Sequence, residues 1–287
     1  IGFRGTKLRD GFKNSLRPLR PGAVIVFKHN ISSPSQIAAL NSQAQEVSVS
    51  TTSLPLLLMI DQEGGVVSRI KTRPSSPSAL SIGMTQNPAL AESAGFATGK
   101  ILRLLGFNTN LAPVIDISDP YANNFIGNRS FGDNPHRVKV MGERFATGLE
   151  RAGVLATFKH FPGNGGSVID SHKGLPQKLI SEEELLNNDL IPFSYLSQTK
   201  IPSAIMVAHI AFPNIDPEGT PATFSKIMIS EVLRKKLNYS GLVITDDIEM
   251  HGAKVIPSVG ERAVRALEAG SDMIMVAWTH RRQKDAF

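Results

Sequence analysis

The stretch from residue 158 to residue 172, FKHFPGNGGSVIDSH, gathers ionisable side chains around a glycine-rich turn. Lys159 and His160 come directly after a short apolar run, and Asp170 and His172 follow the glycines. An apolar strand that leads into a charged loop is the usual way in which a barrel or an open parallel sheet presents reactive groups. The sequence therefore predicts an active-site loop at this position.

Other apolar runs also end in side chains that can ionise or form hydrogen bonds. In a parallel barrel the carboxyl ends of the strands meet at one face, so polar residues directly after the strands are candidates for catalysis. One such residue would mean little, but five strand ends of this kind are hard to attribute to chance. The residues are Asp61, Asp116, Lys159 with His160, His209, and Asp246 with Asp247.

The absence of several known motifs limits the kinds of reaction that the protein is expected to catalyse. The sequence contains no phosphate-binding P-loop, no nicotinamide fingerprint and no HExxH spacing, so we expect neither a cofactor nor a metal ion. Carboxylates, histidines and arginines without a cofactor suit hydrolysis or group transfer on a polar substrate. Ordinary structural roles fit Asp116 and His209 at least as well as catalytic ones, and Asp247, Glu63 and Glu249 have no predicted catalytic role.

Short apolar runs alternate with longer segments of helical periodicity, which predicts parallel βα units. Helix signals include Ser181 with Glu184, Ser258 with Glu261, and Asn134 before a proline. We expect one domain over residues 1–287, an α/β single TIM-type (β/α)8-like barrel with its first strand and last helix cut short; an open doubly wound sheet is the alternative. The predicted strands are 23–27, 56–60, 110–115, 155–158, 204–208, 242–245 and 273–277, with an eighth at 1–3.

The amino-acid composition of the chain limits the kinds of molecule that it is expected to bind. The chain has 287 residues, a net charge of +6 and no cysteine, which excludes disulfides and thiolate chemistry. Lysine and arginine are interspersed with acidic residues, and few aromatic residues are available to stack bases, so no nucleic-acid partner is expected. No apolar run is long enough to cross a bilayer, so no membrane partner is expected either.

Four motifs in order carry a resemblance to a known family. They are IDQEGGVVSR (60–69), NRSFG (128–132), KHFPG followed by DSH (159–172), and TDDIEM (245–250). The chain resembles glycoside hydrolase family 3, in particular the bacterial β-N-acetylglucosaminidases of peptidoglycan recycling.

The resemblance implies a retaining, exo-acting hydrolase that releases terminal β-linked N-acetylglucosamine through a covalent glycosyl-enzyme. Asp246 would be the nucleophile, and His172 with Asp170 would act as acid/base dyad. Imidazole suits this role because it titrates near neutral pH. The residues that would bind the sugar are Asp61, Arg69, Arg129, Lys159 and His160.

The resemblance also implies a small-molecule carbohydrate substrate, either an N-acetylglucosaminyl muropeptide or a chito-oligosaccharide, and a monomer in the cytoplasm. Because the sequence opens on Ile1 rather than methionine, an exported form is the alternative. One departure stands out: Asn164 occupies a position where the family usually has histidine, which affects loop closure or substrate preference. We expect residues 164–166 to let the loop move.

Three other functions fit parts of the sequence. A β-glucosidase of the same family would leave the Asp-Ser-His loop unexplained, because those enzymes generally take their acid/base from a second domain. A non-catalytic sugar-binding barrel would bind N-acetylglucosamine without turnover. A Schiff-base aldolase would use Lys159 as its nucleophile.

Overall fold

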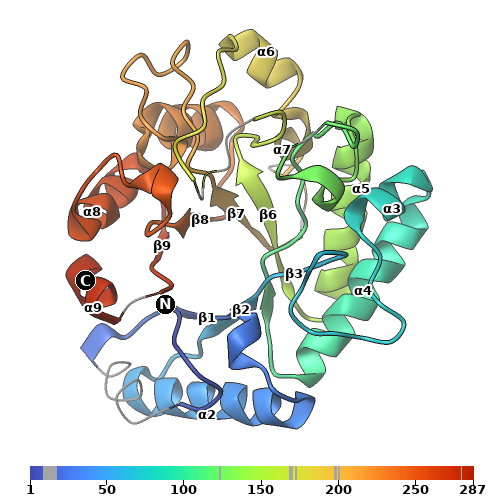
Figure 1. Cartoon of the computed structure of the whole chain (residues 1–287), viewed down its shortest axis with the longest axis vertical. Coiled ribbons are helices and arrows are strands. Elements are labelled where there is room, and N and C mark those ends of the chain that lie inside the picture. Colours follow the sequence, from blue (N-terminus) through green and yellow to red (C-terminus); the bar gives the residue numbers. More distant parts are fainter. Residues whose placement is uncertain are drawn as a thin grey trace.

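The computed structural model describes residues 1–287 except 9–17, 123, 168–170, 172, 197–198, 200 and 279. Within the described residues, seven parallel strands form a curled sheet in the order β1-β2-β5-β6-β7-β8-β9 (Figure 1). The strands are β1 (Ala23–Val26), β2 (Leu57–Ile60), β5 (Thr109–Asn110), β6 (Leu155–Phe161), β7 (Ser203–Val207), β8 (Leu242–Asp247) and β9 (Met273–Met275). A separate antiparallel hairpin pairs β3 (Gln62–Gly64) with β4 (Val67–Ser68).

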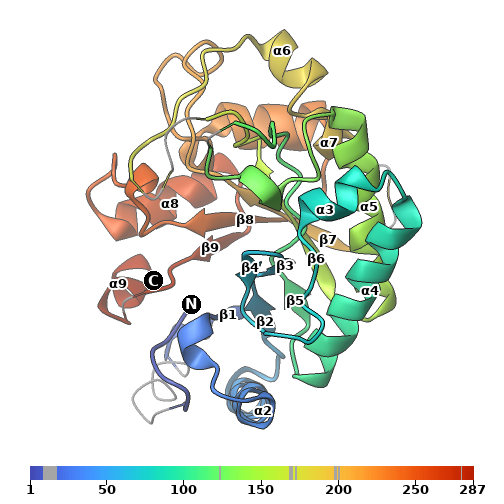
Figure 2. The ribbon, with the colours of Figure 1, turned by 45° about the vertical axis from the view of Figure 1, so that its right-hand side comes forward.

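Helices surround the outer face of the sheet (Figures 1 and 2). No helix among the described residues is long and apolar enough to cross a membrane. The α-helices are α2 (Pro34–Thr52), α3 (Ala79–Met84), α4 (Pro88–Leu104), α5 (Pro135–Arg151), α6 (Glu182–Asn187), α7 (Ile191–Ser194), α8 (Val259–Ala269) and α9 (His280–Ala286). Shorter or wider helical segments are η1 (Lys28–Asn30), η2 (Gly127–Arg129), η3 (Ala222–Phe224), the π-helix η4 (Ile227–Lys236) and η5 (His251–Ala253).

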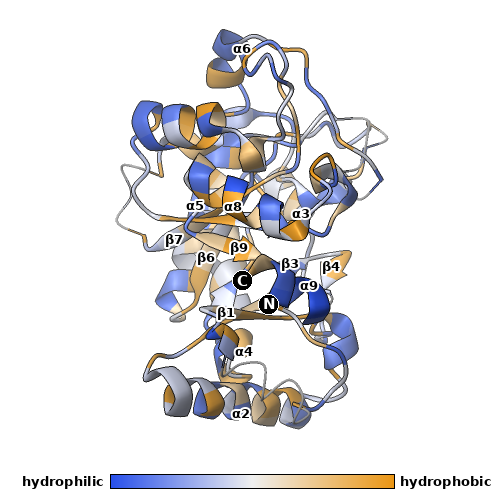
Figure 3. Cartoon of the chain, turned by 90° about the vertical axis from the view of Figure 1, so that its left-hand side faces the viewer, coloured by the Kyte–Doolittle hydropathy of each residue, from blue (hydrophilic) through white to orange (hydrophobic). Residues whose placement is uncertain are grey.

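The strands are buried on both faces, as the almost uninterrupted apolar runs require. Along β1, Ala23 and Ile25 belong to a small apolar cluster inside the curled sheet, whereas Val24 and Val26 belong to the large core beneath the helices. This alternation follows from the two-residue period of a strand. Figure 3 shows hydrophobic residues on the central strands and mixed hydropathy on the helices around them.

The predicted barrel-type fold is confirmed, and its seven main strands occur in the predicted order. Two details differ. Strand β5 is shorter than the predicted 110–115, because Pro113 has no N–H to give to the ladder. Residues 1–3 are not a regular strand, although the backbone N–H of Ile25 donates to the carbonyl of Ile1 at 2.9 Å. The two ends of the chain meet where Gln283 donates to the Gly2 carbonyl.

The helix signals of the sequence are largely confirmed. Ser181 and Glu184 form the complete capping box at the start of α6, and Asn134 accepts a hydrogen bond from the Arg137 N–H at the start of α5. At α8, Ser258 accepts from the N–H of Glu261, which is half of the predicted box. Capping of this kind satisfies backbone N–H groups that have no partner inside the helix.

Candidate active site

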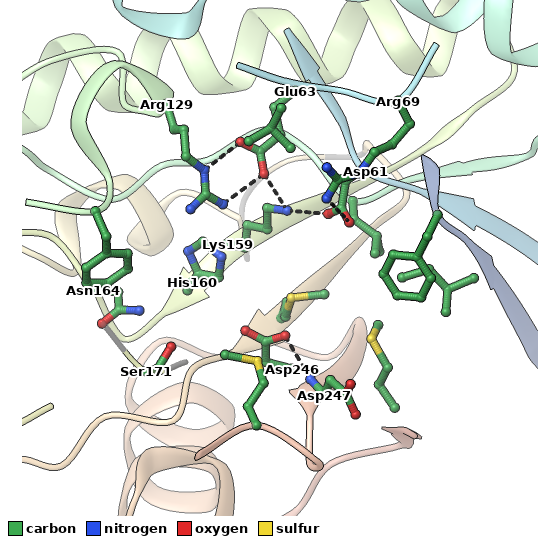
Figure 4. A pocket seen from close by; sticks show the side chains of 18 of the residues that line it. Asp61, Glu63, Arg69, Arg129, Lys159, His160, Asn164, Ser171, Asp246 and Asp247 are labelled. Carbon is green, nitrogen blue, oxygen red and sulfur yellow. Dashed lines mark hydrogen bonds and ion pairs between the residues drawn. The ribbon is translucent and has the colours of Figure 1, made fainter. Parts of the chain in front are cut away.

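A cavity of about 660 Å³ opens at the carboxyl ends of the strands. The position is the one expected for a parallel barrel, where the loops after the strands supply the reactive groups. Apolar side chains of β1, β7 and β9 line part of it, including Ile25, Met206 and Met275. These two methionines thus border the site. Its polar residues are Lys28 and His29, together with the ten labelled in Figure 4: Asp61, Glu63, Arg69, Arg129, Lys159, His160, Asn164, Ser171, Asp246 and Asp247.

Strand β6 carries two of these side chains at adjacent positions. Neighbouring residues of a regular strand point to opposite faces. Here the pairing with β7 is irregular: Lys159 is opposite Met206 and Phe161 is opposite Val207, so His160 is left without a partner. An extra residue of this kind redirects side chains locally. Both Lys159 and His160 therefore line the cavity. The sequence had predicted that they follow the strand, but they lie within β6.

A network of buried ion pairs holds Lys159. Its Nζ lies 2.8 Å from Asp61 Oδ1 and 2.7 Å from Glu63 Oε1, and its side chain is 3% exposed. Burial alone would lower the pKa of Lys159, but the charges of Asp61 and Glu63 outweigh it and raise the pKa. The lysine is thus held as a cation, which does not suit the unprotonated amine that a Schiff-base aldolase requires.

Arg129 completes the network. It lies at the end of η2 and makes a bidentate pair with Glu63, with Nε at 2.8 Å from Oε2 and Nη2 at 2.9 Å from Oε1. Burial would raise the pKa of Glu63, but the charges of Lys159 and Arg129 hold it well below its ordinary value. The side chain of Arg69 is more open, at 30% exposure, and reaches Asp61 Oδ2 at 3.5 Å. The β3–β4 hairpin brings Glu63 and Arg69 to the same wall of the cavity.

Asp116 fixes the next part of the wall. Its Oδ2 lies 2.7 Å from His160 Nδ1, and its Oδ1 accepts from the backbone N–H of Asn164 at 2.6 Å. Burial opposes ionisation of Asp116, but His160 and these hydrogen bonds lower its pKa overall. Because an ionised carboxylate only accepts, Nδ1 of His160 carries a proton. The residue predicted to have an ordinary structural role therefore orients a side chain of the site.

The two consecutive aspartates at the end of β8 have different environments. Burial would raise the pKa of Asp246, but His209, His160, the Asp247 N–H and Lys159 together lower it. That N–H donates to Asp246 Oδ1 at 2.8 Å. For Asp247, burial dominates and raises the pKa to about 7, helped by the charges of Glu249 and Asp246.

The opposite rim of the cavity is aromatic. Phe27, after β1, and Trp278, after β9, stack with ring centroids 4.8 Å apart, and His29 stacks against Phe27 at 5.8 Å. The backbone N–H of Trp278 donates to Glu249 Oε2, which positions that ring. The site thus combines charged side chains with apolar and aromatic ones, as binding pockets for small molecules commonly do.

The structure brings six of the predicted site residues into one cavity: Asp61, Arg69, Arg129, Lys159, His160 and Asp246. Asp170 and His172 lie outside the described residues, although Ser171 between them lines the cavity. His209 is not among the lining residues; its ring nitrogens contact the Asp247 carbonyl and the Thr223 hydroxyl. No group of three or more histidines, aspartates and glutamates among the described residues could hold a metal ion.

Glu63 had no predicted role, and Asp116 was a candidate both for catalysis and for an ordinary structural role. Glu63 is the partner of both Arg129 and Lys159, and Asp116 is the partner of His160. For Asp116 the position after a predicted strand was a usable signal. Glu63 follows Asp61 by two residues, so a short strand would place both on one face.

Comparison with known proteins gives the family. The glycosyl hydrolase family 3 N terminal domain matches residues 4–285. The chain belongs to glycosyl hydrolase family 3. A protein named beta-hexosaminidase from Methylococcus capsulatus is 38% identical over 262 residues, covering 90% of this chain and 76% of the relative. Another beta-hexosaminidase, from Pseudomonas aeruginosa, is 35% identical, covering 96% of this chain and 81% of the relative.

Solved structures agree with this family membership. A family 3 beta-N-acetylglucosaminidase from Paenibacillus superposes with a TM-score of 0.94 at 38% identity; it covers 99% of this chain, which spans about half (54%) of that protein. NagZ from Neisseria gonorrhoeae, solved with N-trifluoroacetyl-D-glucosamine, gives 0.89 at 28% identity and covers 99% of this chain and 82% of its own. The predicted family and the glycoside hydrolase class are thus confirmed, with β-N-acetylhexosaminidases as the relatives.

Proposed function

We propose that the chain is a retaining, exo-acting β-N-acetylglucosaminidase in which Asp246 is the nucleophile. The observation that carries this proposal is the lowered pKa of Asp246 at the end of β8, in a cavity whose opposite wall is a fixed network of charged side chains. An ionised carboxylate in this position can attack an anomeric carbon and form a glycosyl ester, which divides one difficult displacement into two easier ones.

The charged wall is suited to binding the hydroxyl groups of a sugar. Asp61 and Arg69 lie at one end of the cavity and Arg129, Lys159 and His160 continue the wall toward Asp246 (Figure 4). Their partners hold these side chains before any substrate arrives, so little ordering remains to be done on binding. Such donors and acceptors discriminate strongly, because a substrate without the matching hydroxyl leaves a buried group unpaired.

Proton transfer is assigned to His172, oriented by Asp170. In the first step Asp246 bonds to the anomeric carbon while the bond to the leaving oxygen breaks, and the imidazolium of His172 gives that oxygen its proton. In the second step the imidazole takes a proton from water, the water oxygen bonds to the anomeric carbon, and Asp246 leaves as a carboxylate. Ser171, which lies between Asp170 and His172 in the sequence, lines the cavity at 3% exposure, and this supports the assignment.

The natural substrate that we propose is a small carbohydrate: an N-acetylglucosaminyl muropeptide or a chito-oligosaccharide released during cell-wall recycling. The proposal rests on the names of the relatives, which are hexosaminidases and N-acetylglucosaminidases. We further propose that the protein works as a monomer in the cytoplasm. Sedimentation and cell fractionation would test these two points.

The test of the mechanism is covalent trapping. A 5-fluoro N-acetylglucosaminyl inhibitor should label Asp246, and Asp246→Ala should abolish hydrolysis of an aryl N-acetylglucosaminide. The exposed Asp285 supplies the matched control, since Asp285→Ala should leave turnover intact. Turnover that survives loss of Asp246 would refute the assignment. Preference for an aryl glucoside would instead indicate a β-glucosidase, and binding of N-acetylglucosamine without turnover would indicate a sugar-binding protein.

A further inference from the structure

Asn164 is a buried polar side chain of the cavity that the mechanism above does not use. It follows β6 in the turn that begins at Pro162, and it is 3% exposed. Its Oδ1 is fully buried and has no hydrogen-bond partner among the described residues. A buried amide group left unpaired costs about 1–3 kcal/mol, so such groups in native proteins call for an explanation.

The backbone around Asn164 is held firmly in place. Its N–H donates to Asp116 Oδ1 at 2.6 Å, the same carboxylate that orients His160. The next residue, Gly165, packs so closely that an added Cβ would lie 1.7 Å from the carbonyl oxygen of Ile117. This packing argues against a hinge at Asn164 and Gly165, where we had expected the loop to bend; Gly166, with a φ of +74° and open space beside it, is not constrained in this way.

The backbone of Asn164 is fixed, but the oxygen of its carboxamide has no partner among the described residues. Rotation of the amide plane exchanges oxygen and nitrogen, so Asn164 can present either an acceptor or a donor to the cavity. Nothing in the described part of the chain holds it in one orientation. Asn164 lines the cavity, so a molecule bound there can supply a partner for its carboxamide.

The position of Asn164 indicates which part of that molecule it meets. Figure 4 shows Asn164 and Ser171 at one end of the cavity, Asp61 and Arg69 at the other, and Asp246 between them. A sugar whose hydroxyls contact Asp61 and Arg69, and whose anomeric carbon faces Asp246, directs its leaving group toward Asn164.

We propose that Asn164 is a specificity-determining residue that hydrogen-bonds a hydroxyl of the leaving sugar. The inference rests on the proposed function and goes beyond it, because it assigns a contact on the leaving-group side and favours a saccharide there over an apolar group. A phenyl leaving group has no hydroxyl to offer, so it cannot satisfy the carboxamide in the same way.

The experiment compares two substrates with the same glycosyl half, N,N′-diacetylchitobiose and 4-nitrophenyl N-acetylglucosaminide. Asn164→Leu keeps the approximate shape of the side chain and removes its polar atoms. The ratio of kcat/KM for the disaccharide to that for the aryl glycoside should fall about three- to tenfold, the equivalent of one hydrogen bond. The matched control is Asn41→Leu, another buried asparagine with an unpaired Oδ1 but in α2, away from the cavity; it should not change the ratio.

Binding gives a readout that does not depend on turnover. In an Asp246→Asn background, adding Asn164→Leu should weaken the disaccharide about three- to tenfold more than it weakens N-acetylglucosamine, by calorimetry. Equal losses on both ligands would overturn the proposal in favour of a contact with the glycosyl half or a role in folding, and no loss on either would overturn it as well. If the unmodified enzyme bound both sugars but hydrolysed neither substrate, the proposed function would fail while this binding test would still decide the role of Asn164.

Discussion

Replacing Asp247 by asparagine should stabilise the protein more at alkaline pH than at acidic pH, where each value is taken relative to the unmodified chain at the same pH. Asp247 is 5% exposed, and its Oδ1 accepts backbone N–H groups of Glu249 and Ala277 at 3.1 and 3.3 Å. Its Oδ2 is buried without a partner in the described residues. Burial therefore disfavours the charged form and raises the pKa of Asp247 from 3.8 to about 7.

The sign and size of the effect follow from proton linkage. Between pH 3.8 and pH 7 the folded chain keeps a proton on Asp247 that the unfolded chain has lost, so the free energy of unfolding falls as pH rises. At about 1.4 kcal/mol per pH unit, the loss totals on the order of 4 kcal/mol and is complete above pH 7. Asparagine is neutral throughout and retains an oxygen for the two N–H donors, so Asp247→Asn avoids this loss.

The assay is urea denaturation of both proteins at pH 4 and at pH 8. The difference in unfolding free energy between the variant and the unmodified chain should move by about 4 kcal/mol in favour of the variant at the higher pH. Ionisable groups that do not interact with Asp247 contribute equally to both proteins and cancel in this difference. The exposed Asp285→Asn should show no such pH-dependent difference. A difference for Asp247→Asn that is the same at both pH values would refute the reasoning.

Two further changes test the wall of the cavity. Glu63→Gln leaves the buried cations Arg129 and Lys159 without one counter-charge and should lower the free energy of unfolding by about 3–5 kcal/mol at pH 7, as measured by urea denaturation. Because the pKa of Glu63 is lowered, this loss should become smaller as the pH falls below 4.5. A loss that stays the same in acid would contradict the ion-pair explanation. Gly165→Ala forces a Cβ against the Ile117 carbonyl and should lower stability by about 1–3 kcal/mol or more, whereas an unchanged melting temperature would show that the turn can shift.

The fold could largely be predicted from the sequence because most of the strands, such as β1, β2, β7 and β9, are short and mainly apolar runs. The runs at 23–27 and 56–60 became β1 and β2, since apolar residues buried on both faces leave little choice of structure. Where prediction was incomplete, local backbone chemistry was the reason. Pro113 prevents β5 from continuing as a regular strand beyond Asn110, and β6 extends past its predicted end because pairing with β7 resumes at Phe161 after the irregularity at His160.

The candidate site could be predicted only in part, because its residues were recognised one by one and its pairings were not. Asp61, Lys159 and Arg129 were expected to bind substrate, but the carboxylate that joins the latter two is Glu63, which lies far from both in sequence. Such a contact depends on the β3–β4 hairpin reaching over the end of β6. Nothing in the local pattern around Glu63 specifies that distance.

Asp246 and Asp247 show that the surroundings of even two adjacent residues could not be predicted from the sequence. They are adjacent and chemically identical, yet the register of β8 with β9 shifts between Ile244 and Asp247, so the two side chains meet different surroundings. Burial would raise the pKa of Asp246, but His209, His160 and Lys159 lower it, whereas burial and the charge of Glu249 raise the pKa of Asp247. Environments that drive two carboxyl groups apart in this way allow one to be a charged nucleophile while its neighbour stays protonated. Below pH 7 a neutral Asp247 adds no negative charge beside Asp246, so the charge that the cavity stabilises there is the one on Asp246.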